Sequence, residues 1–288
     1  MKNKWLYWLL GGITVLSLFS SLHYKIRNNH KNSVFSWFDE PLIDPKTTLN
    51  NISDLDIDTL YQFFSSEYFD NKEKQGQLEQ LLLEFKEHHK DVYLLNGEAE
   101  WALDPESTEL IKYINKTHEF LATRGSHSLI QGIIIDIEPQ TLEEYQTNPD
   151  AVMASFTKGL KKAYEVVHEL ELKVIVCLPY YLDTEGYLSE LETIIAEASD
   201  EVAIMNYYRD LEIEHIATEV ALSQKYNKPI QTIYELQAPG IHGLTEMNTY
   251  YHLGITAVNN NFEQLRTYYR SPINLSYHEL NSLIELKP

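Results

Sequence analysis

Two carboxylates at the end of an apolar run are the side chains in this sequence best suited to carry out chemistry. Residues 132–137 form a β-branched run typical of a buried strand, and Asp136 and Glu138 lie at its C-terminal end. Because side chains alternate along a strand, both carboxylates are expected on the same face as Ile134. Two acids placed in this way are costly unless they are paired or used, and their repulsion would keep one of them protonated near neutral pH. We therefore expect Glu138 to act as a general acid with Asp136 beside it. The alternative is a structural role, such as pairing with Arg209 or capping the next helix.

A third carboxylate and a tyrosine follow two later apolar runs. Glu235 comes directly after residues 230–234, and Tyr207 comes directly after residues 202–206. Cleavage of a glycosidic bond needs an acid for the leaving oxygen and a second group that attacks or stabilises the positively charged sugar. Glu235 is a candidate for that second group, or for a residue that only hydrogen-bonds the substrate, and Tyr207 is a candidate to stabilise developing charge.

The elements that must position these side chains alternate along residues 33–288, which are about as long as one (β/α)8 barrel. The expected strands are residues 34–38, 59–64, 92–95, 132–137, 173–178, 202–206, 230–234 and 255–259. The expected helices are residues 72–89, 107–124, 149–171, 187–198, 212–226 and 262–270. This order predicts repeated βαβ units and an α/β fold, a single (β/α)8 TIM barrel. A doubly wound open sheet is the rival, but no Gly-rich phosphate loop follows any expected strand.

Polar and aromatic residues follow most of the expected strands. In a barrel of this kind the active site lies at the C-terminal ends of the strands. Carboxylates, amides and flat rings at that end make up the composition of a sugar site. The candidate substrate-binding residues are Trp101, Glu98, Asp39, Tyr180, Tyr208, Arg209 and Asn260.

The N-terminal 32 residues belong to a different physical class. Residues 5–22 are a nearly unbroken apolar stretch of about 18 residues with basic residues on both sides, and this length is the lower limit of a membrane-spanning helix. We expect an uncleaved N-terminal anchor in residues 1–32 and a catalytic domain in residues 33–288 outside the cytoplasm. A cleaved signal peptide, which would release a secreted protein, is the competing interpretation.

The charge and the motifs narrow the function classes. The formal net charge is −20 at pH 7, and all Asp and Glu residues lie after residue 32, which argues against nucleic acid and polyanions as partners. The sequence has a single cysteine, no His-x-x-x-His and no Gly-x-Ser-x-Gly, so neither a metal site nor a serine hydrolase is indicated. No cofactor is predicted, and the expected partners are a carbohydrate polymer and, through residues 5–22, a membrane.

Two of these segments resemble motifs of a known family. Residues 132–139, Gly-Ile-Ile-Ile-Asp-Ile-Glu-Pro, are similar to the fourth-strand signature of chitinase-like, family-18-type barrels, and Met205-Asn206-Tyr207 is similar to their sixth strand. The resemblance implies a TIM barrel in which Glu138 is the acid, Asp136 orients an acetamido group and Tyr207 assists.

The sequence departs from that family at two positions. Ile134 stands where the family has the first Asp of its run, and Tyr208 stands where Asp is usual. Both departures weigh against substrate-assisted chemistry on an N-acetyl group. A closer likeness is to poorly characterised bacterial exported glycosidase-like barrels, which share the Gly-x-x-x-Asp-x-Glu-Pro strand, a Tyr-Arg-Asp like residues 208–210 and a Glu like Glu235. Residues 98–101 also look like their third-strand loop.

Three functions are compatible with these features. The first is a membrane-anchored extracytoplasmic glycoside hydrolase acting on cell-wall or exported polysaccharide, with Glu138 as general acid. The second is a catalytically inactive barrel that binds a glycan or an envelope partner through the same mouth, because a fold does not guarantee activity. The third is a membrane-held scaffold whose acidic surface recruits a basic partner.

Overall fold

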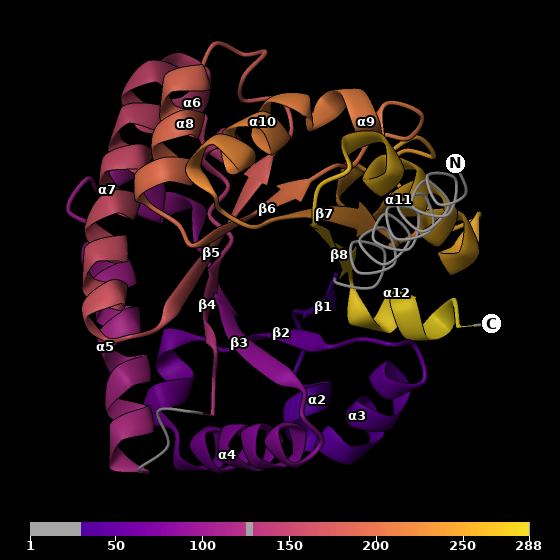
Figure 1. Cartoon of the computed structure of the whole chain (residues 1–288). Coiled ribbons are helices and arrows are strands. Elements are labelled where there is room, and N and C mark those ends of the chain that lie inside the picture. The colour runs from indigo at the N-terminus through magenta and orange to yellow at the C-terminus, as the bar shows by residue number, and fades with distance from the viewer. Residues whose placement is uncertain (1–29, 125–128, 288) are drawn as a thin grey trace, which may run out of the picture.

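The computed structural model describes residues 30–124 and 129–287, and these residues form a closed eight-stranded parallel barrel (Figure 1). The strands are β1 (Asn32–Ser36), β2 (Thr59–Phe63), β3 (Asp91–Asn96), β4 (Gly132–Ile135), β5 (Lys173–Pro179), β6 (Glu201–Met205), β7 (Ile230–Glu235) and β8 (Ile273–His278). The first and last strands pair with each other, with Ser33 opposite Ser276, and this pairing closes the barrel. The predicted (β/α)8 architecture is confirmed, and the open doubly wound sheet is excluded.

Helices surround the barrel (Figure 1). The α-helices are α2 (Glu40–Ile43), α3 (Pro45–Ser53), α4 (Lys72–Glu87), α5 (Thr108–Thr123), α6 (Glu143–Thr147), α7 (Pro149–Glu169), α8 (Leu188–Glu197), α9 (Glu212–His215), α10 (Ala217–Tyr226), α11 (Gly254–Tyr269) and α12 (Leu280–Glu285). Short 3-10 turns are η1 (Ser66–Asp70), η2 (Ala99–Leu103), η3 (Pro139–Thr141) and η4 (Ile241–Gly243). The single helix expected over residues 212–226 is two helices, which meet at Ile216.

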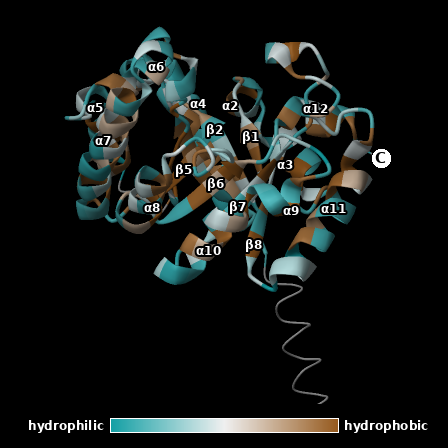
Figure 2. Cartoon of the chain, turned by 90° about the horizontal axis from the view of Figure 1, so that it is seen from above, coloured by the Kyte–Doolittle hydropathy of each residue, from teal (hydrophilic) through white to brown (hydrophobic). Residues whose placement is uncertain are grey.

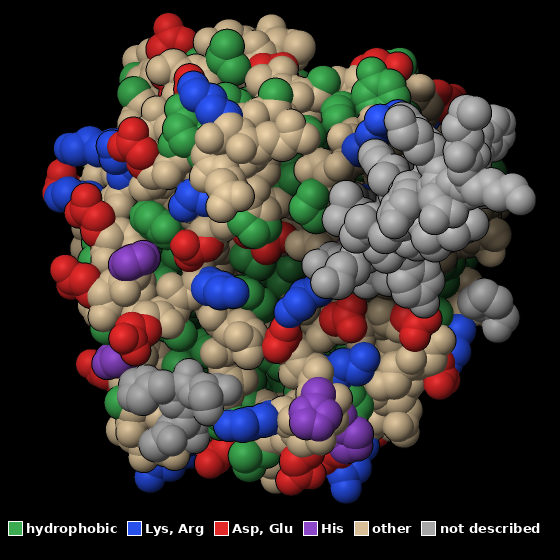
Figure 3. Space-filling model, viewed as in Figure 1, with side chains coloured by type: hydrophobic (Ala, Val, Ile, Leu, Met, Phe, Trp, Pro, Cys, Tyr) green, Lys and Arg blue, Asp and Glu red, His purple; other side chains and the backbone are tan. Residues whose placement is uncertain are grey.

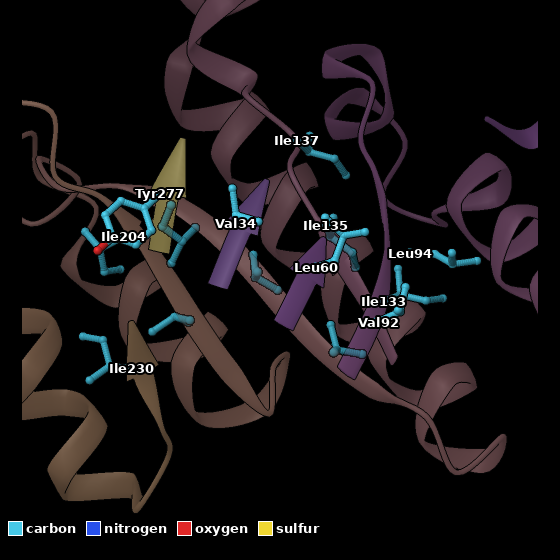
Figure 4. Close-up of a cluster of buried hydrophobic side chains, with 14 of the residues drawn as sticks. Val34, Leu60, Val92, Leu94, Ile133, Ile135, Ile137, Ile204, Ile230 and Tyr277 are labelled. Carbon is cyan, nitrogen blue, oxygen red and sulfur yellow. The ribbon is translucent and has the colours of Figure 1, made fainter. Parts of the chain in front are cut away.

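Side-chain alternation along the strands produces two separate apolar clusters. Outward-facing residues such as Val34, Leu60 and Ile133 are fully buried beneath the helices (Figure 4). The helices carry both hydrophilic and hydrophobic residues, as an amphipathic layer over a barrel requires (Figure 2). The inward-facing cluster fills the barrel and consists of Phe35, Tyr61, Tyr93, Leu95, Ile134, Ile175, Cys177, Ala203, Met205 and Ile233. Packed side chains therefore fill the barrel interior beneath its mouth.

The expected eighth strand, residues 255–259, is wrong. These residues lie in α11, and the eighth strand is β8, which begins at Ile273, 18 residues after the start of the expected strand. Residues 255–259 look like a strand because five residues rich in β-branched side chains are too few to show a helical period. That period becomes visible only over three turns, at the buried positions Ile255, Val258, Phe262 and Leu265.

The predicted membrane anchor, residues 5–22, lies outside the described residues. Within residues 30–124 and 129–287, no helix has both the length and the apolar character needed to cross a bilayer.

Candidate active site

A cavity of about 590 Å³ opens at the C-terminal ends of the strands. Five of the residues expected at the site from the sequence line it together: Asp136, Glu138, Tyr180, Tyr207 and Glu235. A second cavity of about 730 Å³ lies at the opposite end, among the first residues of strands such as Ser33, Thr59 and Lys173. We place the chemistry in the first cavity because the loops that follow the strands of a parallel barrel build its active site.

The β4 strand delivers Asp136 to the mouth as its alternation predicts. Ile133 and Ile135 pack outward and Ile134 lies inside the barrel, so Asp136 follows on the inner face. The backbone N–H of Asp136 donates to the carbonyl of Asn96 (3.1 Å), which keeps β3 and β4 together beyond the end of β4. The approach is so close that a Cβ on Gly97 would lie 2.1 Å from the carbonyl oxygen of Asp136, so only glycine fits there.

Burial and repulsion keep a proton on the Asp136–Glu138 pair. Burial, followed by the Glu138 charge, raises the pKa of Asp136 to about 7, although the His278 charge and the Cys177 thiol act to lower it. Burial also raises the pKa of Glu138, against the charges of His278 and His242. The pair therefore titrates as a unit and holds a proton close to neutral pH.

The hydrogen bonds of the two carboxylates differ. Gln140 donates its side-chain amide to Glu138 Oε2 (2.7 Å). The Oδ1 atom of Asp136 is shielded from solvent and has no hydrogen-bond partner among the described residues. An acceptor left open in this way is expensive unless a ligand donates to it.

Glu235, at the end of β7, is held by two donors. His278 Nδ1 lies 2.8 Å from Glu235 Oε2, and the backbone N–H of Gln237 donates to Oε1 (2.7 Å). The Glu235 side chain is only 3 % exposed. Both oxygens of Glu235 therefore already have hydrogen-bond partners, whereas the Oδ1 atom of Asp136 has none among the described residues.

Trp37 joins this arrangement through the other imidazole nitrogen. Its indole N–H donates to His278 Nε2 (3.0 Å). Burial acts to lower the pKa of His278, but the charge and hydrogen bond of Glu235 and the charge of Asp136 outweigh it, so the pKa is raised. The Trp37 bond opposes that rise because Nε2 accepts only while it is unprotonated.

Two tyrosines complete the walls. Burial, together with the charges of Glu235 and Asp136, raises the pKa of Tyr207 well above its ordinary value, so its hydroxyl stays a donor. Its ring lies 6.1 Å from that of His278. Tyr180 stacks on His215 with ring centroids 4.0 Å apart, which fixes the orientation of the ring that faces the cavity.

Three of the expected binding residues do not line the cavity. Asp39 forms a salt bridge with Lys74 (2.5 Å) and does not line the cavity. Glu98 is exposed, and Trp101 in η2 is half-buried near Tyr113, with ring centroids 6.4 Å apart. The structure therefore does not bring this group to the carboxylates.

The remaining three expected residues are also outside the cavity lining. Tyr208 is 38 % exposed beside His215. Arg209 turns toward Met247 and Tyr250 rather than toward the β4 acids. Asn260 was expected at the end of an eighth strand, and this placement is wrong because it lies exposed on α11.

Sequence reasoning missed several cavity residues, among them Trp37, His242 and His278. His278 ends β8, so the alternation of Ile273, Leu275 and Tyr277 would have identified it once that strand was placed. No local signal indicates His242, because it lies in the loop-like segment between β7 and α11. Within the described ranges there is no cluster of three or more His, Cys, Asp and Glu that could hold a metal ion.

Comparisons with known proteins place the fold. No protein-family model matches the chain, and no curated protein matches it. A GH18 chitinase from Pseudoalteromonas aurantia matches with a TM-score of 0.57 and 12 % identity, covering 87 % of this chain and 94 % of that one. A GH18 chitinase from Cycas revoluta, solved with (GlcNAc)3, matches with a TM-score of 0.57 and 11 % identity, covering 88 % and 96 %.

A third structure is the spore cortex-lytic enzyme SleL of Bacillus megaterium. It matches with a TM-score of 0.53 and 11 % identity, covering 90 % of this chain and 74 % of that one. At this level of identity the likeness concerns the fold and not the activity. The chain therefore has the TIM-barrel fold that GH18 chitinases share.

Proposed function

We propose that this protein is a glycoside hydrolase that acts on a cell-wall or exported polysaccharide, with Glu138 as its general acid. The observation that carries the proposal is one cavity with carboxylates in two different environments. On one side the Asp136–Glu138 pair holds a proton, and on the other Glu235 is held in place by hydrogen bonds from His278 and Gln237. Glycosidic cleavage requires one carboxyl group that gives a proton and a second one that faces the developing positive charge.

The residues divide the reaction as follows. Glu138 donates its proton to the glycosidic oxygen as the bond to the anomeric carbon breaks. The Glu235 carboxylate stabilises the positive charge on that carbon, and Tyr207 holds a substituent of the sugar. Water then adds its hydroxyl to the anomeric carbon and returns a proton to Glu138, which restores the enzyme.

Likeness of fold and the cavity lining support a carbohydrate polymer as the substrate. Structural neighbours include a chitinase solved with an oligosaccharide and a spore cortex-lytic enzyme. Tyr180 and Tyr207 offer rings to sugar faces in the same cavity. With residues 5–22 as an N-terminal anchor, the barrel would work at the outer surface of the cell membrane.

A glycan-binding barrel without turnover is the second candidate. Ile134 favours it, because this apolar side chain fills the barrel interior one alternation below Asp136 and leaves the site with one acid fewer than the resemblance implies. Binding without release of fragments would identify this function.

The test is turnover of purified peptidoglycan and exopolysaccharides by the full-length protein in detergent, with fragments read by mass spectrometry. Glu138→Gln is the test variant. Glu87→Gln is the matched control, because Glu87 is an exposed acid at the end of α4 that does not line the cavity. We expect fragments from the wild type and from Glu87→Gln but not from Glu138→Gln. Equal activity in all three would overturn the assignment of Glu138.

A further inference from the structure

The charge of the mouth cavity is one-sided. Three carboxylates line it, those of Asp136, Glu138 and Glu235, and none of its described lining residues is Lys or Arg. The basic side chains in the cavity lining are His242 and His278, and His278 is already hydrogen-bonded to Glu235. By contrast, Lys and Arg side chains lie among Asp and Glu on the surface in Figure 3. The cavity is thus acidic and holds no Lys or Arg counter-charge in its described lining, which favours a cationic ligand.

One polar atom that the cavity shields from solvent has no partner within the described chain. The Asp136 Oδ1 atom accepts no hydrogen bond although it is shielded from solvent. Gln237 also lines the cavity, and its side-chain amide, which makes no hydrogen bond with the described residues, is accessible to a ligand there. Buried polar groups are nearly always bonded, so Asp136 points to a ligand that donates to it, and Gln237 can exchange hydrogen bonds with the same ligand.

The walls of the cavity suit a positively charged sugar. Trp37, Tyr180, Tyr181 and Tyr207 line it with aromatic rings. The face of such a ring attracts a cation and also packs against the apolar face of a sugar. A neutral ligand would use only the second of these properties and would leave the acidic excess uncompensated.

We propose that the cavity binds a glycan whose sugars carry a free, protonated amino group, and that the ammonium donates to Asp136. This proposal rests on the proposed function for its sugar, and it names the class of that sugar as an unacetylated hexosamine. With the ammonium beside Asp136, the proton that the pair holds stays on Glu138, where cleavage needs it. Acetylation would remove the charge and add bulk at the same position.

The test measures binding separately from cleavage. The full-length Glu138→Gln protein in neutral detergent is titrated calorimetrically near neutral pH with a fully deacetylated chitosan tetramer and with the N-acetylated tetramer. We expect the deacetylated tetramer to bind about tenfold more tightly, the contribution of one charge-assisted hydrogen bond. A second substitution in this protein, Asp136→Asn, should abolish that preference. Glu87→Gln in the same background removes a negative charge from the outer surface and should leave the preference unchanged.

Equal affinity, tighter binding of the acetylated tetramer, no binding of either, or a preference that survives Asp136→Asn would each overturn the proposal. Its failure is distinguishable from that of the proposed function through wild-type turnover. If the wild type cleaves a polysaccharide without preferring free amines, the hydrolase stands and the hexosamine does not. If the preference for free amines holds but no polysaccharide is cleaved, the hexosamine proposal stands and the hydrolase proposal does not.

Discussion

Replacing Asp136 with Asn is expected to make the protein more stable and less active at the same time. Asp136 is a carboxylate that the fold buries beside another, with its Oδ1 atom unsatisfied. Asn fills the same volume without a charge, so the cost of ionising a buried acid disappears. Only a residue kept for its chemistry should show this combination.

The size of the effect follows from the pKa of Asp136. Burial and the Glu138 charge raise it from 3.8 to about 7 in the folded protein. As the pH rises, the unfolded chain loses this proton first, so the free energy of unfolding falls from about pH 4 and levels off above about pH 7. Three units of pKa correspond to about 4 kcal/mol in total. Between about pH 5 and pH 8 the advantage of Asp136→Asn over the wild type should grow by about 3 kcal/mol.

Urea unfolding of the full-length protein at the two pH values measures this difference. Glu219→Gln on α10 is the matched control, because burial raises the pKa of Glu219 to about 8 and neither of its carboxylate oxygens has a described hydrogen-bond partner. Glu219 does not line the cavity, so its replacement should stabilise with a similar pH dependence and leave turnover intact. A gap between Asp136→Asn and wild type that does not widen with pH would refute the reasoning, and so would a less stable variant at pH 8.

Three further changes have expected outcomes. Glu235→Gln should reduce turnover by about a hundredfold or more while oligosaccharide binding persists, because the carboxylate that faces the developing charge is lost; unchanged turnover would remove Glu235 from the mechanism. Gly97→Ala should destabilise the protein by about 2 kcal/mol or more in urea unfolding, since its Cβ would meet the Asp136 carbonyl at 2.1 Å. A neutral effect would mean that the two strands separate easily. Trp37→Phe removes the donor to Nε2 of His278 and should raise the pKa of that imidazole further in an NMR titration, and a fall would contradict the assigned bond.

The sequence predicted the barrel and the β4 acids because both are encoded locally. Period-2 alternation over residues 132–138 determines which side chains enter the barrel, and the structure confirms that Ile134 faces inward. The eighth strand was missed because residues 255–259 show a β-branched composition, and their helical period extends beyond that window. That error moved Asn260 to the mouth and hid His278.

Contacts between residues far apart in the chain could not be predicted. The Trp37–His278 hydrogen bond joins residues 241 positions apart, and no local pattern announces it. Asp39 directly follows the expected first strand, as a binding residue should, but Lys74 of α4 neutralises it. Whether a polar residue at a strand end faces the cavity depends on such partners. Position at the end of a strand alone therefore predicts more site residues than the cavity has.

The proposed reaction depends on Glu138 donating the proton to the leaving group. The most direct measurement compares kcat/KM of the wild type and Glu138→Gln on the natural oligosaccharide and on a dinitrophenyl glycoside of the same sugar, whose leaving group needs no proton. We expect a loss of about a hundredfold or more on the oligosaccharide and little loss on the dinitrophenyl glycoside. An equal loss on both substrates would contradict the role of Glu138 as general acid.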